Sequence, residues 1–70
     1  MDEAMLLMQI GTRIKELRKK RQLTQLGLAL KCKFEKARVS RIETGKTNPT
    51  VKSLYIISQA LESDITDLLE

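Results

Sequence analysis

Basic side chains dominate the groups that could carry chemistry in this sequence. It has 13 lysines and arginines, no histidine, and one cysteine, Cys32. Without histidine, neither Ser-His nor Cys-His catalysis is available, and a single cysteine supports neither a four-ligand zinc site nor an intramolecular disulfide. The remaining chemistry is noncovalent binding of negatively charged groups, and we expect no enzymatic activity, no metal and no cofactor.

The positive charge is concentrated in the middle of the chain. Residues 13–52 contain all 13 basic residues and three glutamates, a net charge of +10, whereas residues 1–12 and 53–70 are both acidic. A basic block of this extent favours a polyanionic partner, with nucleic acid as the first candidate. The run 18–21 alone could equally be a solvated basic face, but the wide spread of the positive charge favours binding.

Aromatic residues are too few for a protein that binds single-stranded nucleic acid. Phe34 and Tyr55 are the only two. Proteins that bind single strands, and modules that read RNA sequence, stack several bases on aromatic side chains. Double-stranded DNA is therefore the favoured partner.

The length of 70 residues predicts one domain, residues 1–70. A domain of this size buries only roughly 60% of the surface that its unfolded chain exposes, so association with a second copy would stabilise it. No apolar run approaches the roughly 18 residues that span a membrane, and the apolar stretch near the N-terminus follows acidic residues, unlike a signal peptide. We therefore expect a cytoplasmic protein with no membrane association.

The spacing of the apolar residues predicts helices throughout the chain. We expect helices over about 6–21, from Thr24 onward, over about 36–43, over about 51–61, and a short one from Asp64. Residues 1–8 are expected to extend the first helix or to form a flexible tail. Gly45 is expected to end the third helix with a positive φ, and Thr50 is expected to cap the fourth. The predicted fold is a compact all-α domain of five helices.

One face of each helix supplies the expected core. The inward residues are Leu7, Ile10, Ile14 and Leu17, then Leu28, Ala29 and Cys32, then Val39 and Ile42, then Val51, Leu54, Ile57 and Leu61, and finally Ile65 and Leu68. The second and third helices are separated by about three residues, which is typical of a helix-turn-helix unit.

Residues between Leu23 and Thr50 carry a resemblance to a known family. They are Leu23-Thr24-Gln25, Leu28-Ala29, Val39-Ser40-Arg41-Ile42-Glu43, Gly45-Lys46 and Asn48-Pro49-Thr50. This pattern resembles the lambda-repressor-like helix-turn-helix family of the Xre or Cro type, which includes restriction–modification controller proteins and small phage-type repressors. The resemblance covers about residues 9–69. It implies a five-helix DNA-binding domain whose third helix enters the major groove.

The resemblance also implies which residues contact DNA. The implied base-reading residues are Lys36, Ala37, Arg38, Ser40 and Arg41, and the implied phosphate contacts are Gln25, Lys46, Thr47 and Asn48. Arg38 lies at the edge of this face, where it could reach a base or a phosphate. Arg41 could donate two hydrogen bonds to guanine, or it could form an intramolecular ion pair instead. Arg18 and Glu43 match a family pair that forms a partly buried salt bridge, so their expected role is structural.

Four positions depart from the family pattern. Gln22, Lys33 and Glu62 stand where the family often has glycine at a helix end with φ > 0, so these ends either tolerate strain or close differently. Glu35 stands where a small hydroxyl residue usually caps the third helix. We expect Glu35 to cap this helix or to favour its positive end, in preference to accepting a hydrogen bond from a cytosine amine.

Apolar residues outside the core stripes predict protein contacts. The resemblance favours Tyr55, Ile56 and Leu69 as the surface of a homodimer. Leu26 and Leu30 lie four residues apart on a face of the second helix that the family usually keeps charged. They are either scattered surface residues, which are common, or a contact for another protein.

These observations predict a sequence-specific transcription regulator that binds double-stranded DNA as a homodimer on a roughly palindromic operator. We expect no small-molecule effector, and regulation through protein concentration would suit an autoregulatory switch. Repression and activation both remain open. The alternative is an antitoxin or another protein-interaction module that uses the same fold, with Leu26 and Leu30 as its contact.

Overall fold

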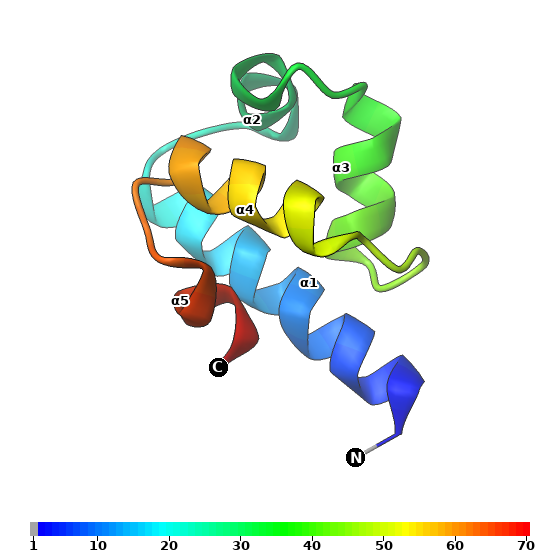
Figure 1. Cartoon of the computed structure of the whole chain (residues 1–70). Coiled ribbons are helices and arrows are strands. Elements are labelled where there is room, and N and C mark those ends of the chain that lie inside the picture. Colours follow the sequence, from blue (N-terminus) through cyan, green and yellow to red (C-terminus); the bar gives the residue numbers. More distant parts are fainter. Residues whose placement is uncertain (1) are drawn as a thin grey trace.

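The computed structural model describes residues 2–70 and confirms the predicted all-α fold of five helices. They are α1 (Glu3–Lys20), α2 (Gln25–Cys32), α3 (Lys36–Glu43), α4 (Val51–Ala60) and α5 (Ile65–Leu69). α2 and α3 lie at the end of the molecule opposite α5, with α1 and α4 between them (Figure 1). In the part of the chain that the structure describes, no helix is both long enough and apolar enough to cross a membrane.

α1 begins about three residues earlier than the sequence predicted. Asp2 is its N-cap, and the Asp2 carboxylate accepts a hydrogen bond from the Met5 N–H at 2.8 Å. The negative charge of Glu3 in the first turn further stabilises the positive N-terminal end of the helix. Residues 3–8 are therefore a helical extension, and Met1 lies outside the described residues. Of the two alternatives that the sequence left open for this segment, the helical extension is therefore the one observed for residues 3–8.

α2 and α4 begin where the sequence predicts, each after a threonine. Thr24 Oγ1 accepts the Gly27 N–H at 2.9 Å, and Thr50 Oγ1 accepts the Ser53 N–H at 3.0 Å. Each bond satisfies a donor of the first turn that has no partner within the helix. The two caps therefore fix the register at which α2 and α4 start.

The core is one cluster of buried apolar residues from all five helices. Its members are Ile10, Ile14, Leu17, Leu28, Ala29, Cys32, Val39, Ile42, Leu54, Ile57, Leu61 and Leu68. Burial raises the pKa of the Cys32 thiol, and the positive charge of Arg38 opposes this shift. Cys32 is therefore a neutral packing residue.

The prediction that Val51 belongs to this core is wrong. The Val51 side chain is 75% exposed, whereas Leu54 and Ile57 on the same helix are buried. Ser58 lies about two turns further along nearly the same side of α4 and is 1% exposed. The position of Val51 in the first turn, and not the side of the helix on which it lies, therefore leaves it exposed. Val51 lies three residues before Leu54, which is the spacing of core residues on a helix, but its side chain does not reach the core.

Three helix ends adopt the left-handed backbone that glycine usually provides. The φ angles are 59° at Gln22, 59° at Lys33 and 55° at Glu62. At each end the next N–H returns to the carbonyl five residues earlier, as Leu23 to Arg18, Phe34 to Ala29 and Ser63 to Ser58. These ends therefore keep the glycine-type closure and tolerate a strain of about 1–2 kcal/mol each. Gly45, at φ 73°, closes α3 in the same way, as the sequence predicts.

Candidate nucleic-acid interface

α3 presents one face to the core and the opposite face to solvent. Val39 and Ile42 are 1% and 3% exposed. Lys36, Ala37 and Arg41 are exposed, and Ser40 is half-buried. The structure therefore brings four of the five implied base-reading residues together on the accessible side of an eight-residue helix. A face of this kind can contact the edges of base pairs when a helix lies in the major groove.

Arg41 is available to an external partner. The ion pairs among residues 2–70 are Arg13–Glu16 and Arg18–Glu43, so the described chain offers Arg41 no acidic partner within 4.0 Å. Its guanidinium makes no hydrogen bond within residues 2–70 either, and it carries five donors in a planar fork. The intramolecular ion pair considered from the sequence does not form.

Arg38 differs from its neighbours on α3 because it makes contacts within its own protein. Its guanidinium lies 3.9 Å from the centroid of the Phe34 ring and donates a hydrogen bond to Ser53 Oγ. The side chain is half-buried. Arg38 therefore ties α3 to the preceding loop and to α4. A sequence gives no sign of this contact, because it depends on how α4 packs beside α3.

Glu35 occupies the N-cap position of α3, but the prediction that its side chain caps this helix is wrong. It makes no capping hydrogen bond, although its backbone has the extended conformation of a cap residue, with φ −76° and ψ 147°. Glutamate has one methylene more than the preferred capping residues, which weakens its fit to the N–H groups of the first turn. The Glu35 side chain is exposed and takes part in no ion pair with residues 2–70.

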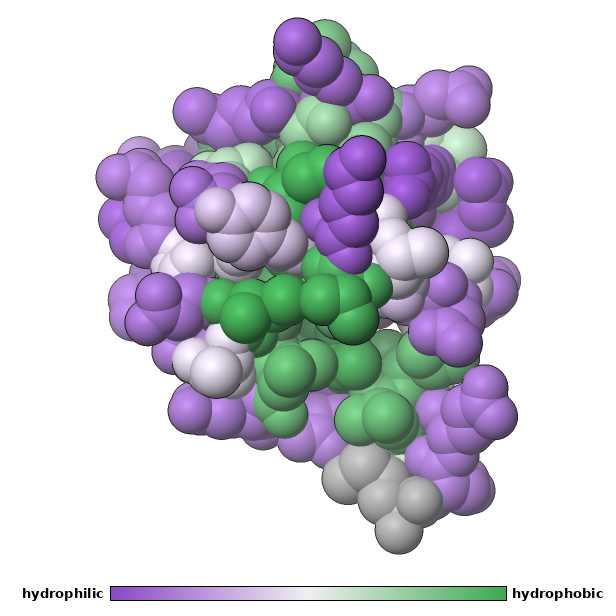
Figure 2. Space-filling model, in the orientation of Figure 1, coloured by the Kyte–Doolittle hydropathy of each residue, from purple (hydrophilic) through white to green (hydrophobic). Residues whose placement is uncertain are grey.

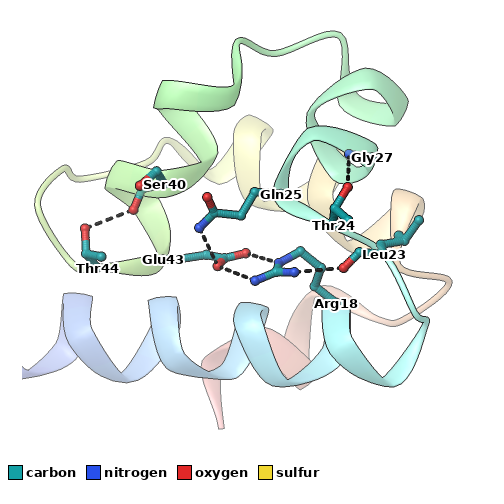
Figure 3. A network of polar contacts seen from close by, with 8 residues as sticks. All are labelled: Arg18, Leu23, Thr24, Gln25, Gly27, Ser40, Glu43 and Thr44. Atoms are coloured by element: carbon teal, nitrogen blue, oxygen red, sulfur yellow. Dashed lines mark hydrogen bonds and ion pairs between the residues drawn. The ribbon is translucent and has the colours of Figure 1, made fainter.

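A buried ion pair fixes the end of α3 to α1 and to the start of α2. Arg18 Nε lies 2.6 Å from Glu43 Oε2, and Arg18 Nη2 donates to Glu43 Oε1 at 3.0 Å (Figure 3). Arg18 Nη1 also donates to the Leu23 carbonyl at 2.7 Å. Both residues are buried, at 7% and 6% exposed. The pair that the resemblance implies is therefore present, and it sets the position of α3.

Gln25 joins the same network from the first residue of α2. Its side-chain amide donates to Glu43 Oε1 at 3.2 Å (Figure 3). This bond turns the amide nitrogen toward the protein. Thr24 occupies the Gly27 N–H, and the backbone N–H groups of Gln25 and Leu26 remain at the helix N-terminus. Such N–H groups favour an anion such as a phosphate.

The segment after α3 is hydrogen-bonded to the last turn of that helix. Thr44 Oγ1 donates to the Ser40 carbonyl at 2.9 Å, and the Lys46 N–H donates to the Arg41 carbonyl at 2.9 Å. Lys46 and Asn48 are exposed, and Thr47 is half-buried. The three implied phosphate-contacting residues of this loop therefore follow directly from the end of α3.

Gly11, which the sequence reading did not single out, lets α1 approach α3 closely. A Cβ atom at this position would lie 2.6 Å from the Glu43 carbonyl oxygen and closer still to that of Ile42. The two backbones therefore touch where α3 ends. A glycine on the buried stripe of a predicted helix is the sequence signal for such an approach.

The expected dimer residues do not all line one groove. Tyr55 and Ile56 line a groove between α2 and α4 together with Lys31 and Gln59, but Leu69 does not. Tyr55 and Leu69 are 55% and 47% exposed, and the half-buried Ile56 packs partly on the core. Figure 2 shows hydrophobic side chains gathered in the middle and lower parts of the face on which α4 lies in Figure 1.

A further apolar pair lies on α2. The Leu26 and Leu30 side chains are 52% and 70% exposed. Their spacing of four residues places them on one side of the helix. Both of the alternatives drawn from the sequence remain compatible with this exposure.

A family model described as Helix-turn-helix matches residues 14–68 of the chain. The matched segment begins within α1 and contains all of α2, α3 and α4.

Similar proteins include a repressor and two regulators of known structure. An immunity repressor protein of Bacillus phage phi105 is 34% identical over 62 residues, which cover 89% of this chain and 43% of the repressor. The restriction-modification controller protein C.AhdI from Aeromonas hydrophila has a TM-score of 0.86 at 27% identity, over 89% of this chain and 94% of the controller. SinR, a master regulator for biofilm formation solved in complex with DNA, has a TM-score of 0.81 at 35% identity, over 87% of this chain and 98% of SinR. The chain thus spans less than half of the phage repressor.

Proposed function

The chain belongs to the helix-turn-helix family, and on this premise we propose that it is a sequence-specific regulator of transcription that binds double-stranded DNA through α3. The observation that carries the proposal is the exposed face of α3, where Lys36 and Arg41 have no intramolecular ion pair within residues 2–70. Val39 and Ile42 anchor the opposite face in the core. A helix held in this way can enter the major groove without losing its packing.

Base reading in this proposal falls to the exposed side chains of α3. Arg41 donates two hydrogen bonds to guanine O6 and N7, which discriminates against other bases by about 1–3 kcal/mol. Lys36 offers a single flexible donor to the same kind of acceptor, and the Ala37 methyl group suits contact with a thymine methyl. Ser40 can donate or accept. Arg38 stays at the edge of this set: Ser53 and the Phe34 ring hold part of its guanidinium, and its remaining donors can reach a base or a phosphate.

Phosphate contacts in this proposal flank α3 on both sides. The start of α2 with Gln25 binds one phosphate through the first-turn N–H groups, and Lys46, Thr47 and Asn48 bind the backbone on the other flank. These contacts orient the protein and carry no sequence information. The central positive charge supplies the salt-dependent part of the affinity.

We propose further that the protein acts in the cytoplasm as a homodimer. Two copies of α3 would meet half-sites about one helical turn apart on a roughly palindromic operator. Tyr55, Ile56 and Leu69 are the proposed contact, because two of them are apolar groups with about half of their surface exposed. When dimerisation is coupled to DNA binding, occupancy depends steeply on protein concentration, which suits control of its own gene.

A selection from randomised duplexes tests this proposal without knowledge of the operator. The purified protein should enrich one sequence with inverted half-sites spaced by about 10 base pairs from centre to centre. If no sequence is enriched and all duplexes bind equally, the basic face binds DNA without sequence preference and the proposal is wrong.

A second candidate function is an antitoxin or another protein-interaction module, which the exposed Leu26 and Leu30 favour. Its test is co-purification with the product of a neighbouring gene. Loss of that complex in Leu30→Lys, with unchanged selection of DNA, would support a protein partner on α2. An unchanged complex in Leu30→Lys would rule out this surface.

A further inference from the structure

We infer that Glu35 is a specificity-determining residue, which accepts a hydrogen bond from the exocyclic amine of a cytosine next to the base that Lys36 contacts. This inference rests on the proposed function, because it concerns the same DNA-facing site. It assigns to Glu35 the role of selecting one base and rejecting the others.

The first step is that the Glu35 carboxylate has no hydrogen-bond or ion-pair partner within residues 2–70. The side chain is exposed and makes no capping hydrogen bond to the first turn of α3. The basic residues nearest in sequence, Lys33, Lys36 and Arg38, are not paired with it, since the ion pairs within residues 2–70 lie elsewhere. Arg38 is instead held by Phe34 and Ser53. The carboxylate therefore has its full accepting capacity for an outside donor.

The second step is its position at the start of the reading helix. Glu35 is the N-cap of α3 and directly precedes Lys36, the first helical residue. In helix-turn-helix complexes the N-terminal residues of the recognition helix reach the base edges. The exposed carboxylate of Glu35 therefore lies at the end of α3 from which base edges are contacted.

The third step is the chemistry of the base edges. A carboxylate offers only acceptors, so in the major groove it can bind only the amines of cytosine and adenine. The adenine amine lies beside the N7 acceptor, which repels a carboxylate. Cytosine presents its amine without a neighbouring acceptor on the same base, so cytosine is the preferred partner.

The fourth step is the electrostatic cost. A carboxylate beside phosphates opposes binding to every duplex, and only a duplex with the matching amine recovers this cost. Such a residue lowers the affinity for wrong sequences more than for the right one, which is how a repulsive group raises specificity. The adjacent Lys36 ammonium moderates the repulsion at the cognate site.

The experiment compares selections from randomised duplexes by the wild type, Glu35→Ala and Glu35→Gln. The matched control is Glu16→Ala, which removes an exposed carboxylate from α1. We expect one position per half-site where the wild type and the control prefer cytosine by roughly 10-fold. Glu35→Ala should lose this preference and bind scrambled duplex more tightly, whereas Glu35→Gln should shift it toward adenine, because an amide both donates and accepts.

Two results would overturn the assignment, and they are distinguishable. If the wild type selects a sequence and all variants keep the same base at every position, Glu35 reads no base, while the proposed function stands. If the wild type selects no sequence, the proposed function fails and this assignment fails with it. Melting temperatures of the Glu35 variants should lie close to that of the wild type, since the side chain makes no hydrogen bond or ion pair within residues 2–70 and its charge at the positive end of α3 contributes only a small stabilisation.

Discussion

Arg38 and Arg41 are three residues apart on α3 and meet different surroundings. The guanidinium of Arg38 has a ring and a hydroxyl group from its own protein, whereas that of Arg41 has neither an ion pair nor a hydrogen bond within residues 2–70. The sequence could not separate the two, because Phe34 and Ser53 come from the loop before α3 and from α4. The resemblance did predict Arg18 with Glu43, because that pair is tied to a recognisable motif.

At this scale, Glu43→Ala should destabilise the fold by about 3–5 kcal/mol. The substitution leaves Arg18 buried without a counter-ion and Gln25 without its acceptor. Urea unfolding followed by circular dichroism measures the change. Glu16→Ala is the control, since Glu16 pairs with Arg13 at 3.8 Å on the surface and should contribute little. Equal midpoints for both variants would show that the buried pair does not stabilise the protein.

At the scale of elements, helix starts and ends were predictable where one side chain decides them. Thr24 and Thr50 cap their helices, and Gly45 ends α3 with a positive φ, because each acts through local geometry. The start of α1 was left open between a helical extension and a flexible tail, because Asp2 caps a first turn that has no apolar stripe. Val51 was wrongly assigned to the core, because the apolar periodicity does not show which turns of a helix pack against the core.

Gln22→Gly should stabilise the protein by about 1 kcal/mol. Gln22 is exposed and holds φ at 59°, a conformation that costs a residue with a Cβ roughly 1–2 kcal/mol. The gain is reduced by the greater backbone entropy of glycine in the unfolded state. Thermal unfolding measures it, with Lys19→Gly inside α1 as a control that should destabilise by about 1 kcal/mol. A lower melting temperature for Gln22→Gly would contradict the strain at this end.

Gly11→Ala should destabilise the fold by about 2–3 kcal/mol or more, because the added methyl meets the backbone carbonyls of α3. The control is Thr12→Ala, on the exposed side of α1. Urea unfolding of both variants gives the comparison. If Gly11→Ala matched its control, the close approach of α1 and α3 would be wrong.

At the scale of the whole molecule, one small core leaves several apolar groups at the surface. Exposed large apolar residues occur on α1, α2, α4 and α5 among the described residues. We propose that a second copy of the chain buries the exposed apolar residues on α4 and α5. This scale was the least predictable from sequence, because the same apolar residue can serve a core, a dimer or no contact at all.

Tyr55→Lys should shift the protein from dimer to monomer without unfolding it, because the exposed ring would no longer bury apolar area against the partner and two like charges would meet. Sedimentation over a range of concentrations measures the state, and Leu30→Lys serves as the control on α2. A monomeric wild type, or a Tyr55→Lys protein that dimerises as the wild type does, would exclude this surface.

The central claim is that the exposed face of α3 reads DNA sequence, and fluorescence anisotropy tests it most directly. The wild type, Arg41→Ala and Lys15→Ala are titrated on the selected duplex and on a scrambled one over a salt series. Lys15→Ala removes the same charge from the exposed surface of α1. Arg41→Ala should lose roughly 10-fold or more in preference for the selected duplex, while its residual binding stays salt-dependent and Lys15→Ala keeps the preference. An Arg41→Ala protein that discriminates between the two duplexes as well as the wild type would contradict the claim.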